Sequence, residues 1–97
     1  MASFIIGKFI GTSHKHLKTR EGESFTKVCF KIEVANEKSP RPSFPFFEAK
    51  ESIVPYLGRL KRGDEVKISF VPDKKGVEGN EISINRAFRV ELVEACQ

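Results

Sequence analysis

The chain has 97 residues and a mass of 11.0 kDa, a length that fits one domain spanning residues 1–97. Hydrophobic residues make up 39% and charged residues 31% of it, which excludes a chain that is disordered by composition. Apolar runs such as residues 4–6 are far shorter than the roughly 20 residues that span a bilayer. Lys8 interrupts the N-terminal apolar patch, so we expect no signal peptide. These features predict a cytoplasmic protein without a membrane partner.

The charge of the chain is concentrated near its N-terminus. Lysine and arginine outnumber aspartate and glutamate by 17 to 13, which gives a net charge of +4. Residues 1–32 hold six basic and two acidic side chains, and the remaining residues hold eleven of each sign. The six basic residues are Lys8, Lys15, Lys18, Arg20, Lys27 and Lys31. A local surplus of this kind indicates a polyanionic partner, with a merely solvated basic face as the alternative.

The residue types that carry catalysis or bind metal do not form a recognisable constellation. Cys29 and Cys96 have neither metal-site nor redox spacing, so we expect reduced thiols. His14 and His16 lie in one polar stretch without cysteines or carboxylates at ligand spacing, so we expect no metal. No Ser-His-Asp set, carboxylate pair or phosphate-binding loop occurs. We therefore predict a protein that is not an enzyme and has no cofactor.

The first strand is predicted over residues 4–10, which are rich in Phe and Ile. Gly7 and Gly11, inside and beside this strand, indicate a bend or a bulge. The next residues, 11–24, are polar and basic, and they are expected to form a long loop.

Two further strands are predicted before residue 51. Residues 25–34 alternate between apolar and polar side chains, which is typical of a half-buried antiparallel strand. A proline-containing turn at 35–42 precedes a third strand at 44–50, where Pro45 favours an edge or a strand start. In the second strand Val28, Phe30, Ile32 and Val34 are expected to face the core, and Phe25, Lys27, Cys29, Lys31 and Glu33 to face outward.

The second half of the chain begins with a change in the spacing of its apolar residues, from that of a strand to that of a helix. In residues 51–60, Ile53, Tyr56, Leu57 and Leu60 have the spacing of one face of a short helix. A tight turn at 61–64 leads to a strand at 65–71, a hairpin loop at 72–80 and a last strand at 81–93. Five short strands with a bent first strand and a helix before the fourth predict an all-β fold, a five-stranded Greek-key OB-fold barrel. An open antiparallel sheet covered by one helix is the alternative.

The sequence resembles a known superfamily. The stretch PFFEAKESIVPYLGRLKRGDEVKISF, residues 45–70, is similar to the third strand, helix and fourth strand of single-stranded DNA-binding proteins. The chain is more similar still to small, uncharacterised bacterial single-domain OB proteins related to that superfamily. The shared patterns are Gly-Lys-Phe-Ile at 7–10, Phe-Glu at 47–48, Gly-Asp-Glu-Val-Lys-Ile-Ser-Phe at 63–70 and Arg-Ala-Phe-Arg-Val-Glu at 86–91. It departs from the superfamily in having no Trp, and in having Lys50 and Glu81 where aromatic residues are common.

The candidate site follows from the strand phases and from the usual OB-fold binding face, which lies over strands two and three between two flanking loops. Phe44 and Phe46 are expected to point outward if Phe47 is in the core, and exposed aromatic rings beside lysines form a platform on which bases stack. Burial in the core or in a subunit interface is the alternative for these rings. The predicted nucleic-acid-binding residues are Lys8, Lys15, Lys18, Arg20, Phe25, Lys27, Lys31, Phe44, Phe46, Lys50, Lys74 and Lys75.

Together these observations predict a non-enzymatic module that binds single-stranded DNA with little sequence preference, in replication, recombination or repair. A small OB domain covers a short stretch of nucleic acid, so we expect a homo-oligomer, a dimer or a tetramer, with higher affinity. Either the first strand or the strand with Pro45 would then pair with a second copy. Two alternatives stay open: an RNA-binding OB module, and a protein-interaction module whose exposed Phe residues form an interface.

Overall fold

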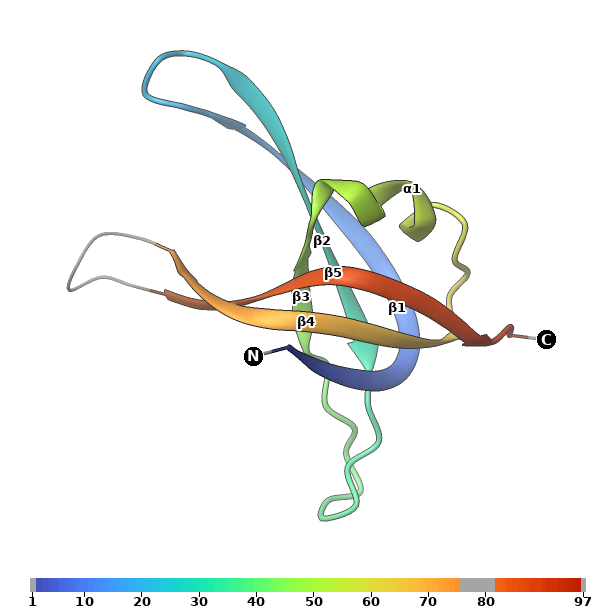
Figure 1. The fold of residues 1–97 in the computed structure, drawn as a ribbon. Helices are drawn as coiled ribbons and strands as arrows, with labels where there is room; N and C mark the ends of the chain where they lie inside the picture. The colour runs from blue at the N-terminus through green and yellow to red at the C-terminus, as the bar shows by residue number, and fades with distance from the viewer. Residues whose placement is uncertain (1, 76–81, 97) are drawn as a thin grey trace.

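The computed structural model describes residues 2–75 and 82–96, and in them five strands form a closed barrel (Figure 1). The strands are β1 (Ser3–Lys18), β2 (Ser24–Glu33), β3 (Phe46–Ala49), β4 (Glu65–Lys75) and β5 (Ile82–Glu94). A short 3-10 helix, η1 (Glu51–Ile53), and one α-helical turn, α1 (Val54–Leu57), separate β3 from β4. The order around the barrel is β1-β2-β3-β5-β4, with β3 and β5 parallel. The predicted OB-fold architecture is confirmed.

The first strand closes the barrel because it has two partners. Its N-terminal half, from Ser3 to Lys8, pairs with β4, and the part from Lys8 to Lys18 pairs with β2. A bulge between Phe9 and Gly11 marks the change, as the glycines predicted. At Gly7 a Cβ atom would lie 2.7 Å from the carbonyl oxygen of Glu33, so only glycine permits the close approach of β1 to β2.

The core is a row of aromatic rings with aliphatic side chains around it. The Phe30 ring lies between those of Phe9 and Phe47, with centroids at 6.4 and 5.4 Å, and Phe70 packs against Phe47 at 5.1 Å. The predicted phase of β2 is confirmed: the side chains of Val28, Phe30 and Ile32 are buried and that of Val34 is partly buried. This phase directs Phe25, Lys27 and Lys31 of β2 to the outer side of the barrel, where they form part of the candidate site.

The prediction for the helical face was partly wrong. Ile53 and Leu57 are buried and Leu60 is partly buried, but Tyr56 is exposed. The segment begins as a 3-10 turn with about 3.0 residues per turn, and its α-helical part is a single turn. The expected 3.6-residue spacing is therefore broken, and Tyr56 turns toward solvent.

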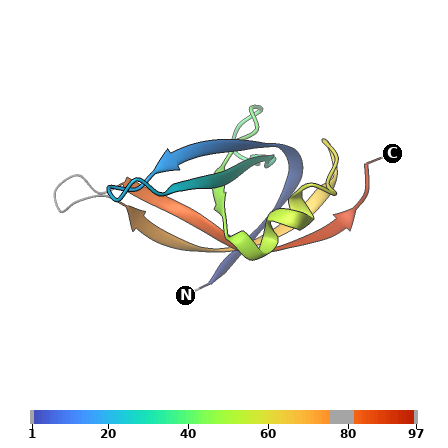
Figure 2. The same ribbon diagram turned by 90° about the horizontal axis from the view of Figure 1, so that it is seen from above.

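The prediction of a long loop at residues 11–24 was also wrong. β1 continues to Lys18 and β2 begins at Ser24, so the two strands form a long hairpin that projects beyond the barrel (Figures 1 and 2). Pairing with β2 supplies the hydrogen bonds that hold these polar residues extended. In the same way β4 continues to Lys75, four residues past the predicted end, whereas most of the predicted 72–80 loop, residues 76–80, lies outside the described residues.

Candidate nucleic-acid interface

The projecting hairpin positions most of the basic residues that the sequence singled out. Lys15 and Lys18 lie on β1, and Arg20 lies in the turn that follows. In this turn the backbone N–H of Gly22 donates to the carbonyl oxygen of Thr19 at 3.0 Å, and Gly22 has a φ of +88° that favours glycine. The tight turn keeps the three cations on a rigid two-stranded arm.

The two faces of this arm differ because directly opposed residues of an antiparallel pair share a face. Lys15 lies opposite Lys27, and Leu17 lies opposite Phe25. Leu17 and Phe25 are both exposed, so this face combines apolar side chains with amines. The other face has His16, whose Nδ1 is 3.1 Å from Oγ1 of Thr26.

The face with Phe25 continues onto the outside of the barrel. Lys31 lies opposite Phe46 where β2 pairs with β3, and opposite Gly11 where β2 pairs with β1. Phe46 is 49% exposed, whereas its neighbour Phe47 is 1% exposed, so the predicted alternation along β3 is confirmed. Phe44, just before β3, is exposed as well. An aromatic ring next to an ammonium group is the pair needed to hold a nucleotide by its base and its phosphate.

Two hollows lie along this outer face. One, of about 310 Å³, is lined by Gly11, Lys31 and Phe46 together with neighbouring residues of β1 and β2. The other, of about 540 Å³, is lined by Phe25 and Lys27 with residues of β3 and η1. The candidate interface therefore has an aromatic side chain and a lysine at each of two concave places.

A chain of ion pairs crosses the face at the second of these hollows, which Lys27 and Glu48 both line. The Nζ atom of Lys27 is 2.9 Å from Oε2 of Glu48, and the side chains are only 18% and 13% exposed. Nη2 of Arg86 is 3.7 Å from Oε1 of Glu48, and its Nη1 is 3.2 Å from Oδ2 of Asp73. Among the described residues two cations thus face two carboxylates, and the charges of these four side chains cancel.

Cys29 lies beneath this network, opposite Glu48 in the β2–β3 pair. The sequence predicted an outward, half-buried thiol, but Cys29 is buried, with 5% of its surface exposed. Burial raises the pKa of the Cys29 thiol, and the nearby Glu48 carboxylate raises it further. The thiol is therefore protonated and serves as a small apolar filler under the ion pairs.

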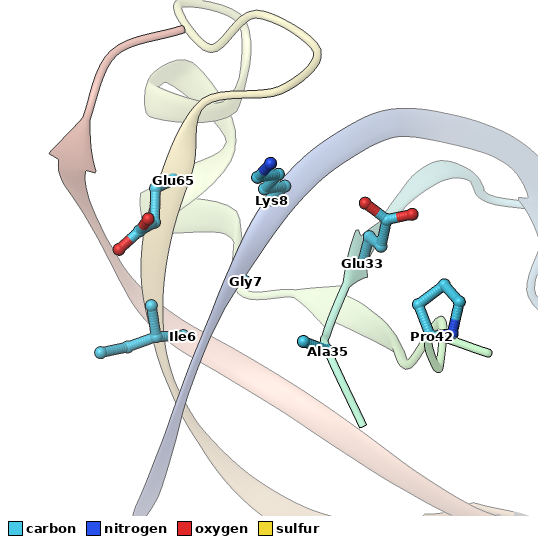
Figure 3. Close-up of a pocket in the computed structure, with 7 residues that line it drawn as sticks. All are labelled: Ile6, Gly7, Lys8, Glu33, Ala35, Pro42 and Glu65. Atoms are coloured by element: carbon cyan, nitrogen blue, oxygen red, sulfur yellow. The ribbon is translucent and has the colours of Figure 1, made fainter. Parts of the chain in front are cut away.

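Lys8 differs from the other predicted residues in having two carboxylates beside it. It lies opposite Glu33 on β2 and opposite Glu65 on β4, and the three line a separate hollow of about 400 Å³ (Figure 3). Glu33 is six positions from Lys27 along β2, about 20 Å, and two positions from Lys31. Two carboxylates beside Lys8 make this end of the barrel a poor place for a phosphate.

The remaining predicted residues flank the face. Lys50 is exposed and precedes η1, and its backbone N–H donates to the carbonyl oxygen of Ala87 at 2.9 Å. Lys74 and Lys75 are the last residues of β4, but their side chains lie outside the part that the structure describes.

Sequence reasoning missed three participants in this face. Leu17 was assigned to a loop, although its place opposite Phe25 follows once the hairpin is extended. Alternation with the core residue Phe47 predicts an outward Glu48, but it does not predict the partners of Glu48. Arg86 reaches it only through the parallel pairing of β3 with β5, for which the sequence contains no local signal.

Within residues 2–75 and 82–96, no three His, Cys, Asp or Glu side chains gather closely enough to hold a metal ion. Cys29 and Cys96 do not form a disulfide. In the same described part of the chain, no helix has the length and apolar character needed to cross a membrane.

The order and pairing of the strands define an OB-fold barrel. Solved structures with the same fold include the mitochondrial single-stranded DNA-binding protein Rim1 of S. cerevisiae, with a TM-score of 0.70 and 9% identity. That comparison covers 99% of this chain and 98% of Rim1. Plasmodium falciparum SSB in its complex with single-stranded DNA is similar too, with a TM-score of 0.53, 11% identity, and coverage of 98% and 94%. No protein-family model matches the sequence. No curated protein matches it either.

Proposed function

We propose that the chain is a single OB-fold domain that binds single-stranded DNA, without catalysis and with little sequence preference. The observation that carries this proposal is the outer face of the barrel, on which the exposed Phe46 lies opposite Lys31 across the β2–β3 pair. Stacking on an aromatic ring is open to every base, so this mode of binding selects single strands rather than a sequence. The names of the solved proteins that share the fold describe them as single-stranded DNA-binding proteins, which agrees with the proposal.

The binding residues in this proposal fall into two groups. Phe25, Phe44 and Phe46 stack with bases. Lys15, Lys18, Arg20, Lys31 and Lys50 neutralise phosphates along the arm and the barrel, joined by Lys74 and Lys75 where β4 ends. Two predicted residues are left out of this set: Lys8, because Glu33 and Glu65 lie beside it, and Lys27, because it pairs with Glu48. We propose a cytoplasmic role in replication, recombination or repair, in keeping with two cysteines that do not form a disulfide.

The proposed assembly is a homo-oligomer, a dimer or a tetramer, formed through the outer face of the N-terminal half of β1. Phe4 is 63% exposed there, Ile6 is also exposed, and the ammonium group of Lys67 lies 4.4 Å from the centroid of the Phe4 ring. Apolar side chains gathered on one strand face of this kind mark interfaces. Phe4→Lys should shift the sedimentation coefficient to that of the monomer.

The test of DNA binding is a fluorescence-anisotropy titration with labelled oligo-dT at several salt concentrations, with double-stranded DNA of the same length as the control. The proposal predicts binding to oligo-dT that weakens as salt rises, because phosphate neutralisation releases counterions. Equal binding to duplex DNA, or no binding at the lowest salt, would contradict it. Competition with oligo-rU separates a DNA-binding module from an RNA-binding one.

A further inference from the structure

We infer that Glu48 acts as an internal competitor of phosphate: it occupies Lys27 and Arg86, keeps the DNA backbone off the centre of the face and lowers the affinity for DNA. This inference rests on the proposed function and adds a residue that regulates the same site. Its basis is the chain of ion pairs from Lys27 through Glu48 and Arg86 to Asp73, which crosses β2, β3, β5 and β4.

The first step of the argument is that Lys27 is occupied. Its ammonium group is 2.9 Å from a carboxylate oxygen of Glu48, and the two side chains are largely shielded from solvent. A charge-assisted contact of this length with little water access is strong and well oriented. A phosphate that approached Lys27 would have to displace the carboxylate, so it would exchange one anion for another.

The second step is that the same carboxylate also faces Arg86. The guanidinium group of Arg86 bridges Glu48 and Asp73, at 3.7 and 3.2 Å. Among the described residues the network contains two positive and two negative groups, so these four side chains together carry no net charge to attract a phosphate. Lysines of this face for which the described residues show no carboxylate partner remain available to the DNA backbone. Lys31, beside Phe46, is the nearest of them along β2.

The third step concerns the path of the nucleic acid. Aromatic side chains at Phe25 and Phe46 lie on either side of the balanced centre, in the two hollows. A neutral, polar strip between two stacking positions favours bases over phosphates. The backbone is thereby directed along the flanks of the face, where the arm supplies Lys15 and the barrel supplies Lys31.

The test replaces Glu48 by Gln, which keeps the shape and removes the charge. Release of Lys27 and Arg86 should steepen the dependence of log K on log salt by about 0.7 for each new phosphate contact. Affinity for oligo-dT at 0.1 M salt should rise about fivefold per contact. A slope of about 0.7, taken over the one decade of salt concentration from about 1 M to 0.1 M, corresponds to a factor of about five in K. The matched control is Glu91→Gln, because Glu91 pairs with Nε of Arg89 at 2.8 Å outside this network. It makes the same change in net charge and should leave the slope unchanged.

A second comparison assigns the effect to Lys27. In the Glu48→Gln background, Lys27→Ala should remove one of the new contacts and lower the slope by about 0.7. In the wild-type background the same substitution should change the slope by much less, because Lys27 is already paired. Equal loss in both backgrounds would show that Lys27 contacts phosphate beside an intact Glu48, and would overturn the inference.

The outcomes separate this inference from the proposed function. Wild-type binding with an unchanged or shallower slope in Glu48→Gln overturns the inference and leaves the proposed function standing. No binding by the wild type or any variant at the lowest salt overturns both. If Glu48→Gln does not fold by circular dichroism, Glu48→Ala takes its place, because it removes the same charge without leaving an amide under the ion pairs. It should steepen the slope by about 0.7 for each new phosphate contact, and an unchanged slope would overturn the inference.

Discussion

Phe46 lies directly opposite Lys31 across the β2–β3 pair, so an exposed ring and an ammonium group share one position on the outer face of the barrel. Both residues alternate with core residues: Phe30 precedes Lys31, and Phe47 follows Phe46. The packing of the core therefore fixes the spacing between the ring and the charge. Two predictions follow from this pair, and two more follow from features that hold the barrel together.

Phe46→Ala should weaken binding to oligo-dT by about 1–3 kcal/mol, because the substitution removes one stacking ring without exposing core. The sedimentation coefficient should stay the same. Tyr56→Ala is the matched control, since Tyr56 is an equally exposed aromatic residue on α1, outside the interface. An unchanged DNA affinity together with a dissociated oligomer would assign Phe46 to a subunit interface instead.

Lys31→Ala should make the salt dependence of DNA binding shallower by about 0.7 in log–log slope, the value for one lost phosphate contact on a single strand. Lys8→Ala should leave the slope unchanged, because Lys8 lies between the carboxylates of Glu33 and Glu65. Both slopes come from the same anisotropy titrations. If Lys8→Ala had the larger effect, the interface would have to be moved to the hollow of Figure 3.

Asp64 predicts a dependence of stability on pH. Its carboxylate accepts hydrogen bonds from the backbone N–H groups of Cys96, at 2.7 Å, and Lys61, at 2.8 Å, and these bonds lower the pKa of Asp64. Because the pKa is lowered in the folded state, the ionised Asp64 carboxylate stabilises the fold at pH values above the ordinary aspartate pKa of about 3.9. This stabilisation is lost as the pH falls through the lower pKa of the folded protein.

The measurement is the melting temperature of the wild type and of Asp64→Asn between pH 7 and pH 2.5. The wild type should melt at the higher temperature at pH 7, and the difference should shrink as the pH falls below about 4. A difference that is constant with pH would mean that the Asp64 charge does not stabilise the attachment of the C-terminal segment.

Gly7→Ala should destabilise the protein by about 1–3 kcal/mol, as overpacking does at a tight site. The added Cβ would lie 2.7 Å from the carbonyl oxygen of Glu33 and 3.1 Å from side-chain carbons of Ile32 and Val34. Gly11→Ala is the control, because the same atom at Gly11 meets nothing within 4 Å. Urea denaturation of the two variants measures the difference, and equal losses would contradict the close approach of β1 to β2.

The strand phases and the barrel were predictable because they rest on local patterns. Alternation over residues 25–34 identifies Phe30 and Ile32 as core and Lys31 as surface, and the buried side chains agree. The outward direction of Phe46 followed from the same rule. The extension of β1 to Lys18 was not predictable in this way, because residues 12–16 are polar on both faces and only pairing with β2 holds them extended.

The ion pairs of the site escaped prediction for a different reason. Glu48 and Lys27 were both assigned outward positions, but the contact of Glu48 with Arg86 depends on β3 pairing with β5. Residues so far apart in the sequence are brought together only by barrel closure. The burial of Cys29 has the same cause, since the side chains that cover it come from a neighbouring strand.

The two partners of β1 also imply an order of events as the chain folds. Its C-terminal half lies opposite the next strand, with Lys18 paired to Ser24, whereas its N-terminal half must wait for a distant strand, with Ser3 paired to Phe70. Closing a short loop takes far less time and entropy than closing a long one. The pairing of β1 with β2 therefore has the lower entropic cost of the two. During synthesis on the ribosome, Phe4 and Ile6 remain without their strand partner until β4 has emerged.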